Sequence, residues 1–202
     1  MTAPPTGDKS ALFIVDVQND FCEPDGSLKV SGSLDIIPLI NKLRENSKFH
    51  CIVTSRDWHP QNHCSFASNN PGKNLFEAVT IAETGRPQVM WPDHCVEGSF
   101  GAEFHKDLVR ADTDINVLKG KMQWVETYSG FGSIDLGEDL GLVKQLKEKG
   151  VRDIYVCGLA TDYCVGSTAV DAAKYGFTTY LIEDAARAVA PDSEKAMKEK
   201  CD

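Results

Sequence analysis

The architecture of this chain is read most directly from Ala11-Leu12-Phe13-Ile14-Val15-Asp16-Val17. The run is apolar at consecutive positions and contains β-branched residues, so an extended chain here would carry hydrophobic side chains on both faces. Strands of that kind lie buried inside parallel sheets. Four later runs share the pattern, at residues 51–55, 115–118, 154–157 and 178–182. We therefore expect five buried, mostly parallel strands.

Helical periodicity separates these runs. Apolar residues recur at helical spacing over 34–44, 140–146 and 165–173, and again around 196–197. Pro38 fits the first helix only if it lies in the opening turn, and Gly150 is a stop signal after the second. Asp192 or Ser193 is expected to cap the last. The alternation predicts an α/β fold with helices on both faces of the sheet.

Composition and charge narrow the class of protein. The chain has 202 residues, of which 42% are hydrophobic and 25% charged, so we expect one domain over residues 11–202 after a flexible segment at residues 1–10. The net charge of −9, with no basic run, argues against nucleic acids and anionic membranes as partners.

Cysteine usage and hydropathy bear on location. The seven cysteines are scattered and include no Cys-x-x-Cys pair, so neither a disulfide framework nor a four-thiolate zinc site is indicated. No apolar run at the N-terminus is long enough for a signal peptide or a membrane span. A reducing, cytoplasmic location fits best.

Reactive side chains are placed where several of the expected strands end. Asp16 closes the first, Lys119 follows 115–118, and Cys164 comes soon after 154–157. Ligands of open parallel sheets bind beyond the carboxyl ends of the strands. Taken singly, such an acid is usually a loop residue, such a lysine is solvated, and such a cysteine fills the core. Because all three residues are expected at the same edge of the sheet, we favour a joint catalytic role over these separate structural roles.

Two other segments could hold a metal ion. Asp57 and His59 are two residues apart in Arg56-Asp57-Trp58-His59-Pro60, so on an extended chain their side chains point the same way. His94 lies in Trp91-Pro92-Asp93-His94-Cys95 and would supply a third ligand. Two imidazoles and a carboxylate leave an open position on a catalytic ion. From spacing alone, ordinary loop histidines packed by tryptophan and proline are an equal alternative.

The motifs together resemble the nicotinamidases of the isochorismatase-like hydrolase superfamily, from about residue 12 to about residue 189. They are, in order, Val15-Asp16-Val17-Gln18-Asn19-Asp20-Phe21, the two segments above with His63 and Ser65-Phe66, Lys119-Gly120, and Thr161-Asp162-Tyr163-Cys164-Val165. This resemblance implies a three-layer α/β/α sandwich with a doubly wound sheet. It also implies deamidation of nicotinamide to nicotinic acid and ammonia, in the recycling of nicotinamide toward NAD.

The resemblance implies specific roles as well. Asp16, Lys119 and Cys164 would form a catalytic triad that works through a thioester, and a cis peptide would join Leu159 to Ala160. The backbone N–H groups of Ala160 and Cys164 are the natural donors to the oxyanion. The substrate ring would lie among four aromatic residues, namely Phe21, Trp91, Tyr128 and Tyr163.

The same likeness implies that Asp57, His59 and His94 bind one divalent metal ion per chain. Two nitrogen ligands and one carboxylate favour Zn²⁺, and Fe or Mn fits when water completes an octahedron. His63 and Ser65 are candidates to support these ligands, while Cys95, beside His94, could replace one. Residues 60–88 match no family motif beyond Phe66, so we interpret them as a functional excursion whose role the sequence leaves open.

Rival interpretations remain. A related thiol amidase acting on N-carbamoyl or ureido compounds would keep Asp16, Lys119 and Cys164 but would not need the metal ligands. A non-catalytic metal-binding or dinucleotide-binding domain is a second alternative, although no Gly-x-Gly-x-x-Gly follows Asp16 and no phosphate-binding or serine-nucleophile motif occurs. The expected partner is a small molecule, and a homo-oligomer is left open.

Overall fold

A five-stranded parallel sheet forms the centre of the protein, whose computed structural model describes residues 7–201. The strand order is β5-β2-β1-β8-β9, and every neighbouring pair is parallel. All five predicted strands are confirmed. Their bounds are β1 (Ser10–Val15), β2 (Cys51–Asp57), β5 (Ile115–Lys119), β8 (Asp153–Leu159) and β9 (Thr178–Arg187).

The N-terminal segment expected to be flexible was residues 1–10. The first strand already begins at Ser10, which is buried, and residues 1–6 lie outside the described residues. The chain passes from central β1 outward to β2 and β5, then returns to β8 and β9 on the other side of β1. This is the doubly wound order that the resemblance implied.

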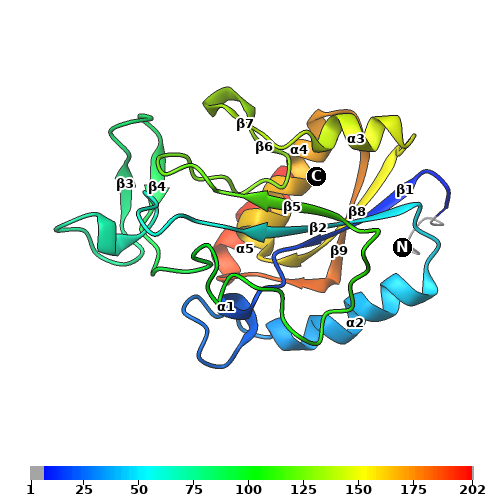
Figure 1. Ribbon diagram of the computed structural model, residues 1–202, viewed down its shortest axis with the longest axis horizontal. Coiled ribbons are helices and arrows are strands. Elements are labelled where there is room, and N and C mark those ends of the chain that lie inside the picture. Colours follow the sequence, from blue (N-terminus) through cyan, green and yellow to red (C-terminus); the bar gives the residue numbers. More distant parts are fainter. Residues whose placement is uncertain (1–6, 202) are drawn as a thin grey trace.

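Side chains of β1 alternate between two cores. Leu12 and Ile14 belong to the cluster that includes Ile36 and Ile40 of α2 (Ser33–Asn46). On the opposite face, Phe13 packs in the cluster that includes α3 (Leu142–Glu148) and α4 (Gly166–Lys174), and α5 (Pro191–Cys201) packs against α4. Figure 1 shows α2 and α3 on opposite sides of the sheet. The three-layer α/β/α sandwich is therefore confirmed.

Two expectations about helix ends were wrong. Pro38 lies inside α2, beyond its first turn, and removes the hydrogen bond that the Leu34 carbonyl would accept. Leu34 lies on an exposed part of the helix, where water can replace that partner. The last helix begins at Pro191, a residue suited to the first helical position, so Asp192 and Ser193 lie within its first turn and do not cap it.

Residues 60–88 are more ordered than their composition indicated. They contain η1 (Ala67–Asn69) and β3 (Ala78–Thr80), which pairs antiparallel with β4 (Pro87–Val89). Figure 1 shows this hairpin beyond the ends of β2 and β5. The remaining short elements are α1 (Asn19–Cys22), β6 (Gly132–Ser133), η2 (Ile134–Leu136), β7 (Glu138–Asp139) and the π-helical turn η3 (Thr161–Val165). Within residues 7–201, no helix has the length and apolar character needed to cross a membrane.

Candidate active site

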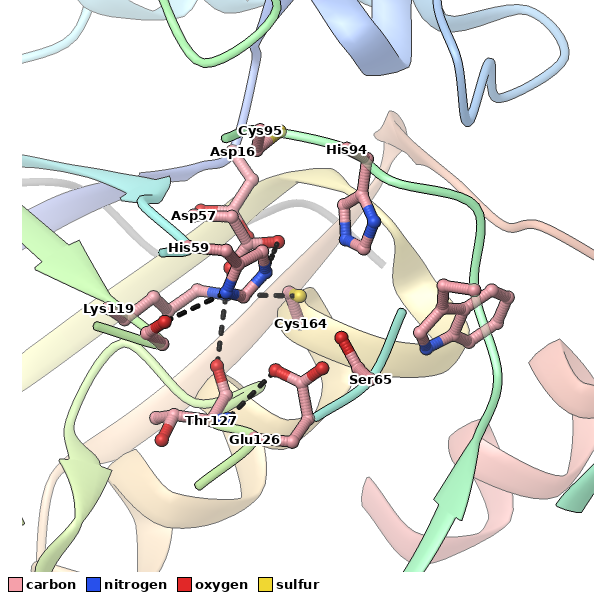
Figure 2. A network of polar contacts seen from close by, with 12 residues as sticks. Asp16, Asp57, His59, Ser65, His94, Cys95, Lys119, Glu126, Thr127 and Cys164 are labelled. Atoms are coloured by element: carbon pink, nitrogen blue, oxygen red, sulfur yellow. Dashed lines mark hydrogen bonds and ion pairs between the residues drawn. The ribbon is translucent and has the colours of Figure 1, made fainter. Parts of the chain in front are cut away.

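The carboxyl edge of the sheet brings Asp16, Lys119 and Cys164 together, as predicted. Lys119 Nζ lies 2.9 Å from Asp16 Oδ2 and donates a hydrogen bond to Cys164 Sγ at 3.2 Å. Asp16 and Lys119 have no exposed surface, and Cys164 is only 6% exposed. Figure 2 shows the contact to the Cys164 sulfur as a dashed line. An ammonium buried this completely is held in one place by the groups around it.

Asp16 has an environment suited to proton transfer. Burial is the largest influence and raises the pKa of Asp16 to about 6, although Lys119 lowers it. Ser55 Oγ also donates a hydrogen bond to Asp16 Oδ1 at 2.7 Å, which favours the charged form. A carboxyl group with a pKa near neutrality can take a proton and return it during one reaction cycle.

The electrostatics of Cys164 are set by burial and by three charged neighbours. Burial raises the pKa of the Cys164 thiol well above its usual value, and the nearby carboxylates Asp16 and Asp57 oppose the lowering effect of Lys119. Lys119 itself stays an ammonium, because the two carboxylates outweigh the effect of burial on its pKa. Lys119 favours the thiolate, but the lysine is shared with two acids. The resting group is a thiol, which needs a base.

Cys164 lies in the turn that joins β8 to α4. The helical spacing over residues 165–173 predicts a helix directly after Cys164, and in the structure Cys164 lies inside η3 while α4 begins at Gly166. The peptide bond between Leu159 and Ala160 is cis, as the resemblance implied. Ala160 and Cys164 line the same pocket, so the expected oxyanion donors belong to its wall.

Asp57, His59 and His94 form a second group beside the first. Their potential ligand atoms all lie within 4.8 Å of one another, and all three residues are buried. His59 Nδ1 lies 2.8 Å from the carbonyl oxygen of Gly120, and His94 Nδ1 lies 2.8 Å from that of Pro92. A carbonyl oxygen only accepts, so in the neutral ring each Nδ1 carries the proton and each Nε2 offers a lone pair.

The free atoms of this group fit a divalent ion. His59 Nε2 is buried without a hydrogen-bond partner, and it lies 3.7 Å from Asp57 Oδ2. The other carboxylate oxygen of Asp57 receives a hydrogen bond from Lys119. Despite burial, Lys119 and His59 hold the pKa of Asp57 well below its usual range. The group therefore offers two imidazole nitrogens and an ionised carboxylate.

Gly120 shows how closely the His59 ring is enclosed. A Cβ atom at this glycine would lie 2.4 Å from His59 Cε1, and the glycine has a φ of +66°, which side-chain-bearing residues rarely adopt.

Although burial opposes it, the Asp57 carboxylate raises the pKa of His59 to about 9. A metal ion would therefore displace a proton from His59 when it binds.

His63 and Ser65 adjoin the group formed by Asp57, His59 and His94. The His63 ring stacks on that of His59 with centroids 4.2 Å apart, and His63 Nδ1 is 2.8 Å from Ser65 Oγ. His63, His59 and Glu126 also have potential ligand atoms within 4.8 Å of one another, a cluster that no sequence motif indicates. Cys95 belongs to none of the possible ligand groups found in the described part of the chain.

The four predicted aromatic residues line one pocket together with Asp57, His94 and Cys164. The rings of Trp91 and Tyr163 meet edge to face at 5.0 Å, and Trp91 Nε1 donates to the Tyr128 hydroxyl at 3.2 Å. The pocket is completed by Leu159 of the cis peptide and by apolar residues that no motif indicated, namely Leu28, Val30 and Val189. The pocket therefore has aromatic and apolar walls, with the Cys164 thiol and the His94 imidazole among its lining groups.

Comparison with known proteins agrees with this arrangement. The Isochorismatase domain family matches residues 10–201. A nicotinamidase of Acinetobacter baylyi is 44% identical over 179 residues, covering 89% of this chain and 81% of the relative. The chain therefore belongs to the isochorismatase-like superfamily. Within it, the protein is an amidohydrolase whose relatives include nicotinamidases.

Solved structures of related enzymes have the same fold. A protein from L. infantum, in complex with nicotinate, superimposes with a TM-score of 0.86 at 35% identity, covering 99% of this chain and 92% of the other. The pyrazinamidase of Pyrococcus horikoshii, in complex with zinc, has a TM-score of 0.75 at 36% identity, covering 96% and 94%.

Proposed function

We propose that this protein deamidates nicotinamide to nicotinic acid and ammonia, with Cys164 as the nucleophile and a divalent metal ion as an aid to substrate binding. The observation that carries the proposal is the aromatic pocket, in which Cys164 with its acid and lysine faces His94 and Asp57 of the possible metal site. The relatives' recorded activity and the nicotinate and zinc complexes of the two related structures support it.

The metal would be held by Asp57, His59 and His94. When bound, such an ion offers a Lewis-acid position for a pyridine nitrogen and so fixes the direction of the ring. Zn²⁺ suits the donor set best, while Fe or Mn is compatible with it. Phe21, Trp91, Tyr128 and Tyr163 would enclose the ring and direct its carboxamide toward Cys164.

The chemistry would be performed by the residues on the strand ends. Asp16 takes the proton of the Cys164 thiol as Sγ attacks the amide carbon, and the carbonyl oxygen becomes an oxyanion facing the N–H groups of Ala160 and Cys164. Such donors typically contribute about 10²–10³ in rate each. Lys119 compensates the negative charge that moves between Asp16 and the thiol.

Collapse of this intermediate breaks the carbon–nitrogen bond. Asp16 returns its proton to the leaving nitrogen, so ammonia departs and a thioester remains on Cys164. Water then gives a proton to Asp16 and attacks the thioester carbon, and the thiolate leaves and recovers that proton. The products are nicotinic acid and the free enzyme. We infer that the nicotinic acid serves recycling toward NAD.

Two products measured together test the proposal. Purified protein loaded with Zn²⁺ is incubated with nicotinamide, while ammonia is followed by a coupled assay and nicotinic acid by chromatography. The proposal predicts equal amounts of both products from the wild type and neither from Cys164→Ala. Absence of both from the wild type, or their undiminished release by the variant, would contradict it.

A further inference from the structure

Three consecutive residues after β1 use their side chains to bind the backbone of remote segments. Gln18 contacts Asp57, Asn19 contacts Phe100, and Asp20 contacts Cys95. Two of these three targets adjoin or carry proposed metal ligands. We propose that Gln18 and Asp20 are positioning residues that hold the two ligand-bearing segments together before an ion binds. The inference rests on the ligand set of the proposed function.

The side chain of Gln18 makes the hydrogen bonds that a neighbouring strand would otherwise make with Asp57. The last paired residues of β1 and β2 are Val15 and Ser55, after which Asp16 turns away with a φ of +50° while β2 continues to Asp57. The backbone of Asp57 is left facing the place that β1 has vacated. The side-chain amide of Gln18 fills it, accepting from Asp57 N at 2.8 Å and donating to Asp57 O at 2.8 Å.

The Gln18 amide is fixed in turn by its surroundings. It is fully buried, and its Nε2 also donates to the carbonyl oxygen of Ala102 at 2.9 Å. No water reaches it to replace these bonds. The orientation of the Asp57 carboxylate therefore depends on a side chain that contacts neither the proposed ion nor the substrate.

Asp20 secures the other ligand segment. Its Oδ2 accepts a hydrogen bond from Cys95 N at 2.7 Å, directly after ligand His94. Cys95 has a φ of +46°, which non-glycine residues seldom adopt, so its backbone needs such support. The carbonyl oxygen of Cys95 accepts from His59 N at 3.0 Å. The residue that Asp20 holds, Cys95, is thus the one whose carbonyl group joins the segments of His59 and His94.

Gly101 provides a separate way to disturb Asp20. A Cβ atom at Gly101 would lie 2.0 Å from Asp20 Oδ2, so Gly101→Ala must displace the carboxylate without removing it. Asn19 is the matched control, because it is buried in the same turn and its Nδ2 donates at 2.8 Å to the carbonyl oxygen of Phe100, a residue that neither is nor adjoins a proposed ligand. Asp20→Asn is the conservative variant, since it keeps an oxygen that can accept from Cys95.

Zn²⁺ affinity tests the proposal without reference to turnover. The dissociation constant is measured by competition with a chromophoric chelator, and the thermal unfolding midpoint of each metal-free variant is recorded alongside. Loss of residues that orient metal ligands typically weakens binding by about 10–100-fold. We expect that range for Gln18→Leu, Asp20→Ala and Gly101→Ala. Asn19→Ala and Asp20→Asn should stay within about threefold of the wild type, the scatter usual for context-dependent effects.

The affinities of the variants separate the positioning role from the ligand set itself. If Gln18→Leu does not fold, Asp20→Ala and Gly101→Ala carry the test. Affinity near that of the wild type in both, or an equal loss in Asn19→Ala, overturns the positioning role. His94→Ala in the same assay tests the ligand set itself. If only His94→Ala loses the ion, the proposed metal site stands and the positioning role falls, whereas a wild type that binds no ion removes both.

Discussion

The catalytic group and the possible metal site lie side by side, yet they are built in different ways. Asp16 and Lys119 stand at the ends of sheet strands, so their positions follow from the sheet itself. His94 lies on a segment between β4 and β5 and is located through side-chain to backbone hydrogen bonds. This contrast teaches that some groups of a site are placed by regular structure, as Asp57 also is at the end of β2, while others, such as His94, depend on the packing of loops.

The largest expected effect comes from removing the thiol of the strand-end group, which consists of Asp16, Lys119 and Cys164. Cys164→Ala should lower the rate of nicotinamide hydrolysis by several powers of ten, since it removes the nucleophile, with Asp16→Asn nearly as severe. Ammonia release measures the effect, and the unfolding midpoint confirms folding. Cys157→Ala is the control, because Cys157 is a fully buried cysteine of β8 that does not line the pocket. Activity within tenfold of wild type in Cys164→Ala would end the mechanism.

A change in the loop-borne group should act differently. We expect His94→Ala to reduce nicotinamide hydrolysis by about 10²-fold, a size typical for loss of a group that orients the substrate. Alkylation of Cys164 by iodoacetamide should continue, because Asp16 and Lys119 are untouched. The control is His105→Ala, another buried histidine that lies outside the pocket. Equal loss of hydrolysis and of thiol reactivity would show that the two groups are not separable.

Lys119 is the residue that both groups share, since its amine contacts Asp16, Asp57 and Cys164. Its charge lowers the pKa of Asp16 and of Cys164, so Lys119→Met should raise both and slow hydrolysis. The pH dependence of Cys164 alkylation should move to higher pH in the variant. An unshifted profile would deny Lys119 an electrostatic role.

The smallest expected effect is a shift of the acid limb in the pH profile of kcat/KM. Asp16 must be ionised to accept the thiol proton, and its pKa is raised to about 6, so kcat/KM should be full above that pH and fall below it. The Ser55 hydrogen bond lowers this pKa, and Ser55→Ala should therefore move the limb upward. A limb near pH 4, or one unmoved by the substitution, would assign the titration to another group.

The sequence predicted the strand-end group better than the rest of the site. Buried strands have a strong hydrophobic pattern, and the residue after each one must lie at the same edge, so Asp16, Lys119 and Cys164 could be placed together. Asp57, His59 and His94 were found because they lie in recognisable motifs. Their roles, like those of the triad, remain predictions.

Other features of the structure leave no local signal in the sequence. Leu28, Val30 and Val189 complete the pocket only because distant segments meet there, and apolar loop residues look alike in a sequence. The hairpin of β3 and β4 was missed because its strands are three residues each, too short for alternation to be visible. The contact of Gln18 with the Asp57 backbone likewise depends on where β1 ends relative to β2.

The central claim is that Asp16, Lys119 and Cys164 perform the chemistry, while a metal ion on Asp57, His59 and His94 orients the ring through its nitrogen. Benzamide has the same shape as nicotinamide but lacks that nitrogen, so comparing the two substrates in metal-loaded and metal-stripped protein tests the claim directly. We predict that stripping lowers kcat/KM for nicotinamide by about 10²-fold or more. The much slower hydrolysis of benzamide should not change. A parallel fall for both substrates, or no fall for either, would contradict the account.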